Sequence, residues 1–176
     1  MRDVRLIPNY PCDGLWLVAG REFREVILGE IERARSQLFA SFFLISLLAA
    51  EERGTVRSIL DAFVRARRRY VDVRVIVDDF VLGPNRARAN AAACGYLTEN
   101  DVAVRVFEGG RGRASHSKYL LRDERYAVVG SGNLTPGGLD RNSELALRVD
   151  STDFTRDLSQ RFLEGWQICR AWGHVQ

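Results

Sequence analysis

Short apolar runs alternate with longer amphipathic segments through the first 108 residues of this 176-residue chain. The apolar runs are rich in the β-branched and aromatic residues that favour strands, and they are LWLVAG (15–20), FASFFLIS (39–46), VDVRVIVDD (71–79) and VAVRVFE (102–108). The segments between them repeat apolar residues every three or four positions, as amphipathic helices do, and they cover 21–38, 54–70 and 86–98. This alternation predicts an α/β fold, because helices that connect strands pack on the faces of a sheet.

Strands dominate the chain after residue 102. The apolar runs SKYLLRD and YAVVGS meet at Asp123-Glu124-Arg125, which predicts a hairpin. SELALRV at 143–149 predicts a further strand, and the aromatic residues spaced along 152–172 predict a helix that docks on the sheet. No repeat, low-complexity tract or linker interrupts the pattern. We therefore predict one domain over residues 1–176, an α/β sandwich with a mixed β-sheet flanked by helices.

The composition is that of an ordinary globular protein with a mild excess of positive charge. There are 26 Lys and Arg against 23 Asp and Glu, so the net charge is +3 and the pI is about 9.0, which favours an anionic partner. The three cysteines form no C-x-x-C pair and suggest neither a disulfide framework nor a zinc site. The longest apolar run, 38–50, is shorter than the roughly 20 residues of a membrane span, and the N-terminal sequence lacks a secretory core. We expect a cytoplasmic protein without a membrane span.

Lys118 is the one lysine among the 26 basic residues, and His116 lies two positions before it. Residues i and i+2 of a strand point to the same face, so these two side chains are expected to project together. Hairpin pairing would bring Gly130-Ser131-Gly132-Asn133, at the end of the neighbouring strand, alongside them. Arg111 and Arg113 precede the histidine in a glycine-rich loop and would add a cationic rim. Together these residues predict a site the size of a phosphate group, with one nucleophile or base and several hydrogen-bond donors.

The spacing of these residues, H-x-K-x4-D-x6-G-S-x-N, resembles the signature of the phospholipase D superfamily, often called the HKD motif. The matching residues are His116, Lys118, Asp123, Gly130, Ser131 and Asn133. Asn142-Ser143-Glu144 further resembles a segment that follows the motif in the small single-motif bacterial nucleases of this superfamily. The resemblance implies a phospholipase D-like sandwich and a phosphodiesterase that needs no metal or other cofactor.

The resemblance also implies a mechanism. The His116 imidazole attacks a phosphodiester and forms a phosphohistidine, and a second histidine protonates the leaving alcohol. Lys118 and Asn133 would hold the non-bridging oxygens, with Ser131 beside them as a less secure member of the catalytic set. Glu144 would accept a hydrogen bond from His116 Nδ1, which fixes the tautomer; a surface ion pair is the alternative for this carboxylate.

The other residues of the motif are expected to bind substrate or to support the fold. Arg111, Arg113 and Gly132 would contact substrate phosphates. Asp123 is separated from Lys118 by five positions, roughly 16 Å in an extended strand, so we interpret it as a structural residue of the hairpin turn. Gly130 is likewise interpreted as structural.

Two histidines are needed, and His174, in the terminal AWGHVQ, has no lysine partner. A homodimer in which both His116 side chains face one phosphate would supply the pair, with a dimer surface that includes the GSGN and NLTPGG loops. We expect the substrate to be DNA or RNA and the enzyme to be an endonuclease. The alternatives are a lipid phosphodiesterase or phosphatidyltransferase, and a non-catalytic phosphate-binding subunit of a larger assembly. A nuclease that depends on a partner protein is intermediate between the endonuclease and the subunit of a larger assembly.

Overall fold

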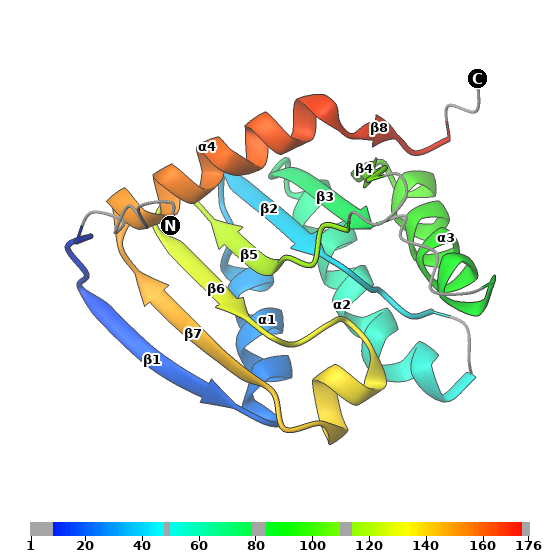
Figure 1. The fold of residues 1–176 in the computed structure, drawn as a ribbon, viewed down its shortest axis with the longest axis horizontal. Coiled ribbons are helices and arrows are strands. Elements are labelled where there is room, and N and C mark those ends of the chain that lie inside the picture. Colours follow the sequence, from blue (N-terminus) through cyan, green and yellow to red (C-terminus); the bar gives the residue numbers. More distant parts are fainter. Residues whose placement is uncertain (1–8, 48–49, 79–83, 110–113, 174–176) are drawn as a thin grey trace, which may run out of the picture.

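The computed structural model describes residues 9–47, 50–78, 84–109 and 114–173. Within these ranges, eight strands form one sheet in the order β1-β7-β6-β5-β2-β3-β4-β8 (Figure 1). The strands are β1 (Gly14–Ala19), β2 (Gln37–Phe42), β3 (Asp72–Asp78), β4 (Ala103–Phe107), β5 (Lys118–Arg122), β6 (Tyr126–Gly130), β7 (Leu145–Asp150) and β8 (Arg170–Ala171). The helices are α1 (Glu22–Arg33), α2 (Ala50–Arg68), α3 (Pro84–Glu99) and α4 (Thr152–Ile168), and η1 (Gly137–Arg141) is a π-helical turn.

The sheet is mixed, as the sequence predicts. β2, β3 and β4 run parallel to one another and are joined through α2 and α3, whereas the other neighbouring strands pair antiparallel. The predicted hairpin is formed by β5 and β6, with Tyr119 opposite Val129. Helices α1, α2 and α3 lie on one face and α4 crosses the other (Figure 1). The predicted α/β sandwich is therefore confirmed.

Alternate residues of the strands fill two cores, one on each face of the sheet. The larger core joins the sheet to α1, α2 and α3. The smaller core joins it to α4, where the Phe162 ring stacks on Phe39 with centroids 4.6 Å apart and on Trp166 with centroids 5.7 Å apart. The aromatic residues of the C-terminal helix thus serve packing. None of the helices in the described ranges is both long and apolar enough to cross a bilayer.

Two predicted helices end earlier than their apolar spacing indicates. The helix predicted over 21–38 ends at Arg33, and Leu38 lies in β2 instead. The helix predicted over 152–172 ends at Ile168, because Cys169 adopts an extended conformation and the next two residues pair with β4. In both cases hydrogen bonds to distant parts of the chain replace those of the helix.

The carboxylate of Asp123 accepts the hydrogen bonds that replace those of the helix after Arg33. Its Oδ1 accepts hydrogen bonds from the backbone N–H groups of Ser36 at 2.8 Å, Arg35 at 3.1 Å and Gln37 at 3.1 Å. Partial burial by itself raises the pKa of this carboxyl, but the hydrogen bonds from Ser36, Gln37 and Arg35 outweigh burial, so the net pKa lies below its ordinary value. The ionised carboxylate therefore holds the β5–β6 turn against the start of β2.

Replacing Asp123 with Asn should lower the free energy of unfolding by about 2–3 kcal/mol at neutral pH, because three N–H groups lose a charged acceptor. Because the pKa of Asp123 is lowered in the folded state, the stabilisation by its carboxylate is present above about pH 4 and is lost as the pH falls through the folded-state pKa. The stabilities of wild type and Asp123→Asn should therefore converge in acid. Urea unfolding at several pH values measures the difference. Glu124→Ala is the control at the same turn, because its exposed ion pair with Arg156 contributes less than about 1 kcal/mol. Equal losses in the two variants would contradict this role of Asp123.

Candidate active site

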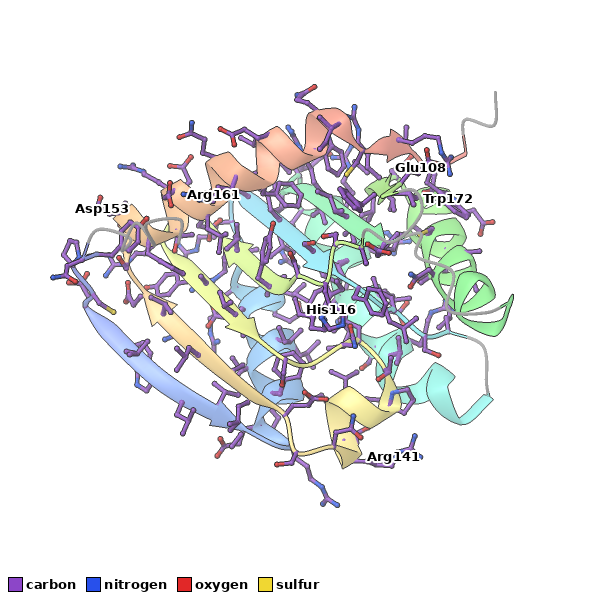
Figure 2. All side chains as sticks on the ribbon, in the orientation of Figure 1. Glu108, His116, Arg141, Asp153, Arg161 and Trp172 are labelled. Carbon is purple, nitrogen blue, oxygen red and sulfur yellow. The ribbon has the colours of Figure 1, made fainter. Side chains whose placement is uncertain are left out.

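Three chain segments meet at the edge of the sheet where the parallel strands end. Lys118 begins β5 and pairs with Phe42, the last residue of β2. The segment that follows β6 runs beside the segment that follows β2, with Leu134 bridged to Ile45. Residues that are distant in the sequence, 42–45, 116–118 and 131–134, therefore line one site, in which His116 projects from the middle of the molecule as viewed in Figure 2.

His116 and Lys118 are in direct contact, as their spacing predicts. Lys118 Nζ donates to the His116 carbonyl oxygen at 2.7 Å and lies 3.0 Å from His116 Nδ1. The ring of His116 is exposed and rests against Phe43, with centroids 4.7 Å apart. Lys118 is 7% exposed and its Nζ lies 5.3 Å from the centre of the same Phe43 ring. A buried cation thus lies directly beneath an accessible imidazole.

The surroundings of Lys118 shift the pKa of its ammonium group. Burial lowers the pKa of the Lys118 ammonium, and the negative charges of Glu144 and Asp78 offset part of this effect. An ammonium has only donors, so His116 Nδ1 accepts from Lys118 and a neutral imidazole carries its proton on Nε2. Attack on an electrophile through Nε2 requires the other tautomer, in which Nδ1 carries the proton.

Asn133 presents the amide donor that the sequence predicts for this site. Its Oδ1 accepts a hydrogen bond from the Leu44 N–H at 3.1 Å, which fixes the orientation of the side chain. Within the described residues, Asn133 Nδ2 donates to no acceptor, so its two hydrogens are available to a substrate oxygen.

Glu144 is not placed where the sequence analysis expects it. Its Oε2 accepts a hydrogen bond from Ser131 Oγ, and its Oε1 accepts one from Asn142 Nδ2 at 3.1 Å. The expected hydrogen bond from His116 Nδ1 is absent in the described chain, because that nitrogen faces Lys118. Glu144 therefore acts on Lys118 through charge, and it orders the Ser131 hydroxyl directly.

The remaining predicted residues fall into three groups. Asp123 follows the last residue of β5, at the opposite end of the strand from Lys118. Gly130 ends β6 against β7, where an added Cβ would lie 2.5 Å from the Cβ of Ala146. Arg111 and Arg113 lie outside the described residues.

Asp78 is a residue of the site to which the sequence analysis assigns no functional role. It ends β3, is 3% exposed, and accepts a hydrogen bond from the Ser115 N–H, so it anchors the segment that leads into His116. The one available signal is its position at the end of a buried parallel strand, where sites of α/β proteins are found. Phe43, which supports the His116 ring, carries no comparable signal. Within the described ranges, no group of three or more metal-ligating side chains occurs.

Comparison with known proteins identifies the family. A family model described as "Cardiolipin synthase, PLD-like domain" matches residues 27–166, most of the chain. The chain belongs to the phospholipase D superfamily. His116, Lys118 and Asn133 all lie within the matched region.

Curated relatives in the superfamily include cardiolipin synthases. Cardiolipin synthase A of Wigglesworthia glossinidia brevipalpis is 31% identical over 102 residues, which is 58% of this chain and 20% of that protein. Cardiolipin synthase B of Salmonella typhimurium is 33% identical over 100 residues, which is 57% of this chain and 24% of that protein. The chain thus spans about a quarter or less of the length of these relatives.

Solved structures share the fold over nearly the whole chain. Nuc, a phospholipase D family member from Salmonella typhimurium, has a TM-score of 0.74 and 20% identity, covering 90% of this chain and 99% of its own. NucT from Helicobacter pylori has a TM-score of 0.71 and 15% identity with the same coverage. Phosphatidylserine synthase of Haemophilus influenzae has a TM-score of 0.65 and 15% identity, and 40% of its chain is covered.

The turn η1 supports the backbone of Asn133 through a glycine. A Cβ added at Gly138 would lie 2.4 Å from the Asn133 carbonyl oxygen, a backbone atom that cannot move without displacing the Asn133 side chain. A Cβ added at the adjacent Gly137 would instead approach the side chain of Asn142 at 3.3 Å. The two glycines are neighbours in sequence, but only Gly138 contacts the segment that carries the site.

Gly138→Ala should lower the free energy of unfolding by about 1–3 kcal/mol, because the added methyl group overlaps fixed backbone. Gly137→Ala is the matched control and should cost less than about 1 kcal/mol. Denaturant unfolding of both variants measures the difference, and an equal effect would show that η1 does not constrain Asn133.

Proposed function

We propose that this protein is a metal-independent phosphodiesterase that cleaves DNA or RNA through a phosphohistidine intermediate. One observation carries the proposal: an exposed imidazole, His116, lies beside a buried ammonium, Lys118, and an amide donor with a fixed orientation, Asn133. This arrangement provides a nucleophile and two donors for the oxygens of a pentacovalent phosphorus.

The proposed reaction has two steps. His116 Nε2 attacks phosphorus, the P–N bond forms, and the P–O bond to the leaving group breaks while a second imidazolium protonates the leaving oxygen. Water then attacks phosphorus, its proton passes to the second imidazole, and the P–N bond breaks to release the phosphomonoester. Both imidazoles regain their starting protonation at the end of the cycle and one water is consumed, so the reaction needs no metal and no further co-reactant.

His116 must change its hydrogen bonding before it can attack. Attack through Nε2 requires the proton on Nδ1, whereas the contact with Lys118 makes Nδ1 an acceptor. A phosphate oxygen that binds Lys118 Nζ would compete for this ammonium and release Nδ1. Substrate binding would thus allow the imidazole to adopt its reactive tautomer, while the negative charge of Glu144 favours the ammonium form of Lys118.

The second imidazole is proposed to come from a second copy of the chain. The chain's other histidine, His174, lies outside the described residues and has no neighbouring lysine in the sequence. A two-fold axis beside the exposed His116 would place two such side chains on opposite sides of one phosphate.

An uncovered apolar surface supports this association. Leu15, Leu17, Leu145 and Leu147 are 61%, 67%, 56% and 41% exposed. Leu17 pairs with Leu147, and Leu15 pairs with Val149, which belongs to the core beneath α4. Paired residues share a face, so these leucines extend the α4 face of the sheet beyond the part that the helix covers. An exposed cluster of this kind is typical of an interaction surface.

A nucleic-acid substrate is the one we favour, because the net charge of +3 suits a polyanion. Phosphatidyl transfer is the second candidate, and the sequence similarity to cardiolipin synthases supports it.

His116→Ala should abolish cleavage of labelled single- and double-stranded DNA and RNA in the presence of EDTA, with a loss of roughly 10⁴-fold or more, because the nucleophile is removed. His174→Ala is the matched control and should retain full activity. Phosphatidylglycerol vesicles serve as the alternative substrate. Cleavage of lipid but not of nucleic acid by the wild type would replace the nuclease with the second candidate, and an active His116→Ala protein would contradict the mechanism itself.

A site shared between two subunits makes a further quantitative prediction. When wild type and His116→Ala are unfolded together in equal amounts and refolded, about a quarter of the dimers contain two intact subunits, so activity should fall to about a quarter of that of the wild type. Independent sites would retain about half. Light scattering on the same samples checks the dimer, and Leu17→Asp with Leu147→Asp should produce a monomer.

A further inference from the structure

A pocket of about 290 Å³ lies between α4 and the segment that carries His116. Ser115 and Ser117, the residues on either side of His116, both line it, and so does Ser41, two residues before the Phe43 that supports the His116 ring. The pocket is therefore walled by the two sequence neighbours of the proposed nucleophile, whose side chains alternate with that of His116 along the segment. The phosphodiester chemistry proposed above does not use this space.

The lining combines aromatic surface with polar groups. Phe107 and Tyr119 contribute rings. Helix α4 contributes Phe162, whose ring is already stacked on Phe39 and Trp166, and Arg161, which pairs with Asp157. Burial raises the pKa of the Tyr119 phenol to about 12, so this group stays protonated and can act as a hydrogen-bond donor at neutral pH. A flat guest with polar edges fits this lining, because rings stack on its faces and hydroxyls meet its edges.

We propose that this pocket binds the base of a nucleotide adjacent to the scissile phosphate. The inference rests on the proposed nuclease function and assigns it a substrate subsite. An acyl chain would fit less well, since it would cover the hydroxyls of Ser115 and Ser117 without offering them partners. The size also suits one small group, because sites for drug-sized ligands begin at about 300 Å³.

A base can enter the pocket only when it is unpaired. Extruding a base from a duplex costs a few kcal/mol, whereas a single strand pays little of this cost. The pocket therefore gives the enzyme a preference for single-stranded nucleic acid. It confers little sequence specificity, because every base has a face on which aromatic rings can stack.

Gly165 of α4 provides the means to test the pocket. It lines the cavity, and a Cβ added there would meet no atom within 4 Å. Gly165→Leu therefore extends a side chain from this open position into the pocket. Gly165→Ala is the matched control: it adds one methyl group, leaves most of the space open and should raise helix stability.

The substrate is a labelled single strand in which the nucleotides on both sides of one linkage are abasic, compared with the same strand bearing all its bases. Product length reports the cleavage rate at that linkage. Wild type and Gly165→Ala should cleave the linkage between bases roughly 5–150-fold faster than the abasic one, since stacking contributes about 1–3 kcal/mol per base. Gly165→Leu should cleave both at the abasic rate.

The experiment distinguishes an error in the proposed base pocket from an error in the proposed nuclease function. Equal cleavage of both strands by the wild type, or an unchanged preference in folded Gly165→Leu, would overturn the base pocket while leaving the nuclease intact. No cleavage of either strand by folded wild type would overturn both. Should Gly165→Leu not fold, Phe107→Leu removes a ring from the opposite wall at similar volume and should reduce the preference for the base-bearing strand; an undiminished preference would overturn the pocket.

Discussion

The hydrogen bonds between Asp123 and the backbone at 35–37 set the register on which the site depends. They hold the turn after β5 against the start of β2, and with this register Lys118 pairs with Phe42. A slip of one residue would send every side chain of β5 to the opposite face, and the ammonium would leave the imidazole. A carboxylate at the far end of β5 thus determines the position of the chain's one lysine.

The candidate site is held mainly by backbone and by small residues. Asn133 is oriented by the Leu44 N–H, the approach to His116 is anchored by Asp78, and Gly138 lies close behind the Asn133 carbonyl. These supports leave the functional ends of His116 and Asn133 accessible. A rigid frame around exposed reactive groups reduces the reorganisation needed when charge builds on a phosphate.

The sequence predicts those features that depend on local periodicity or on fixed spacing. Alternating strands and helices, the β5–β6 hairpin and the contact of His116 with Lys118 all follow from short-range patterns. Features set by distant contacts are missed or wrong: α1 ends at Arg33 because the following N–H groups bind Asp123, and the short strand β8 forms because β4 has a free edge. The hydrogen bonds of Glu144 likewise depend on how two loops meet.

The buried ammonium has a chemical consequence beyond catalysis. Because Lys118 is the chain's one lysine, it supplies the one side-chain amine in the protein, and its lowered pKa leaves a larger neutral, nucleophilic fraction than an exposed lysine has. Reagents that modify lysine side chains therefore have a single target, and it lies beside His116. The extent of such modification would thus measure how far this one position, 7% exposed, opens to solvent.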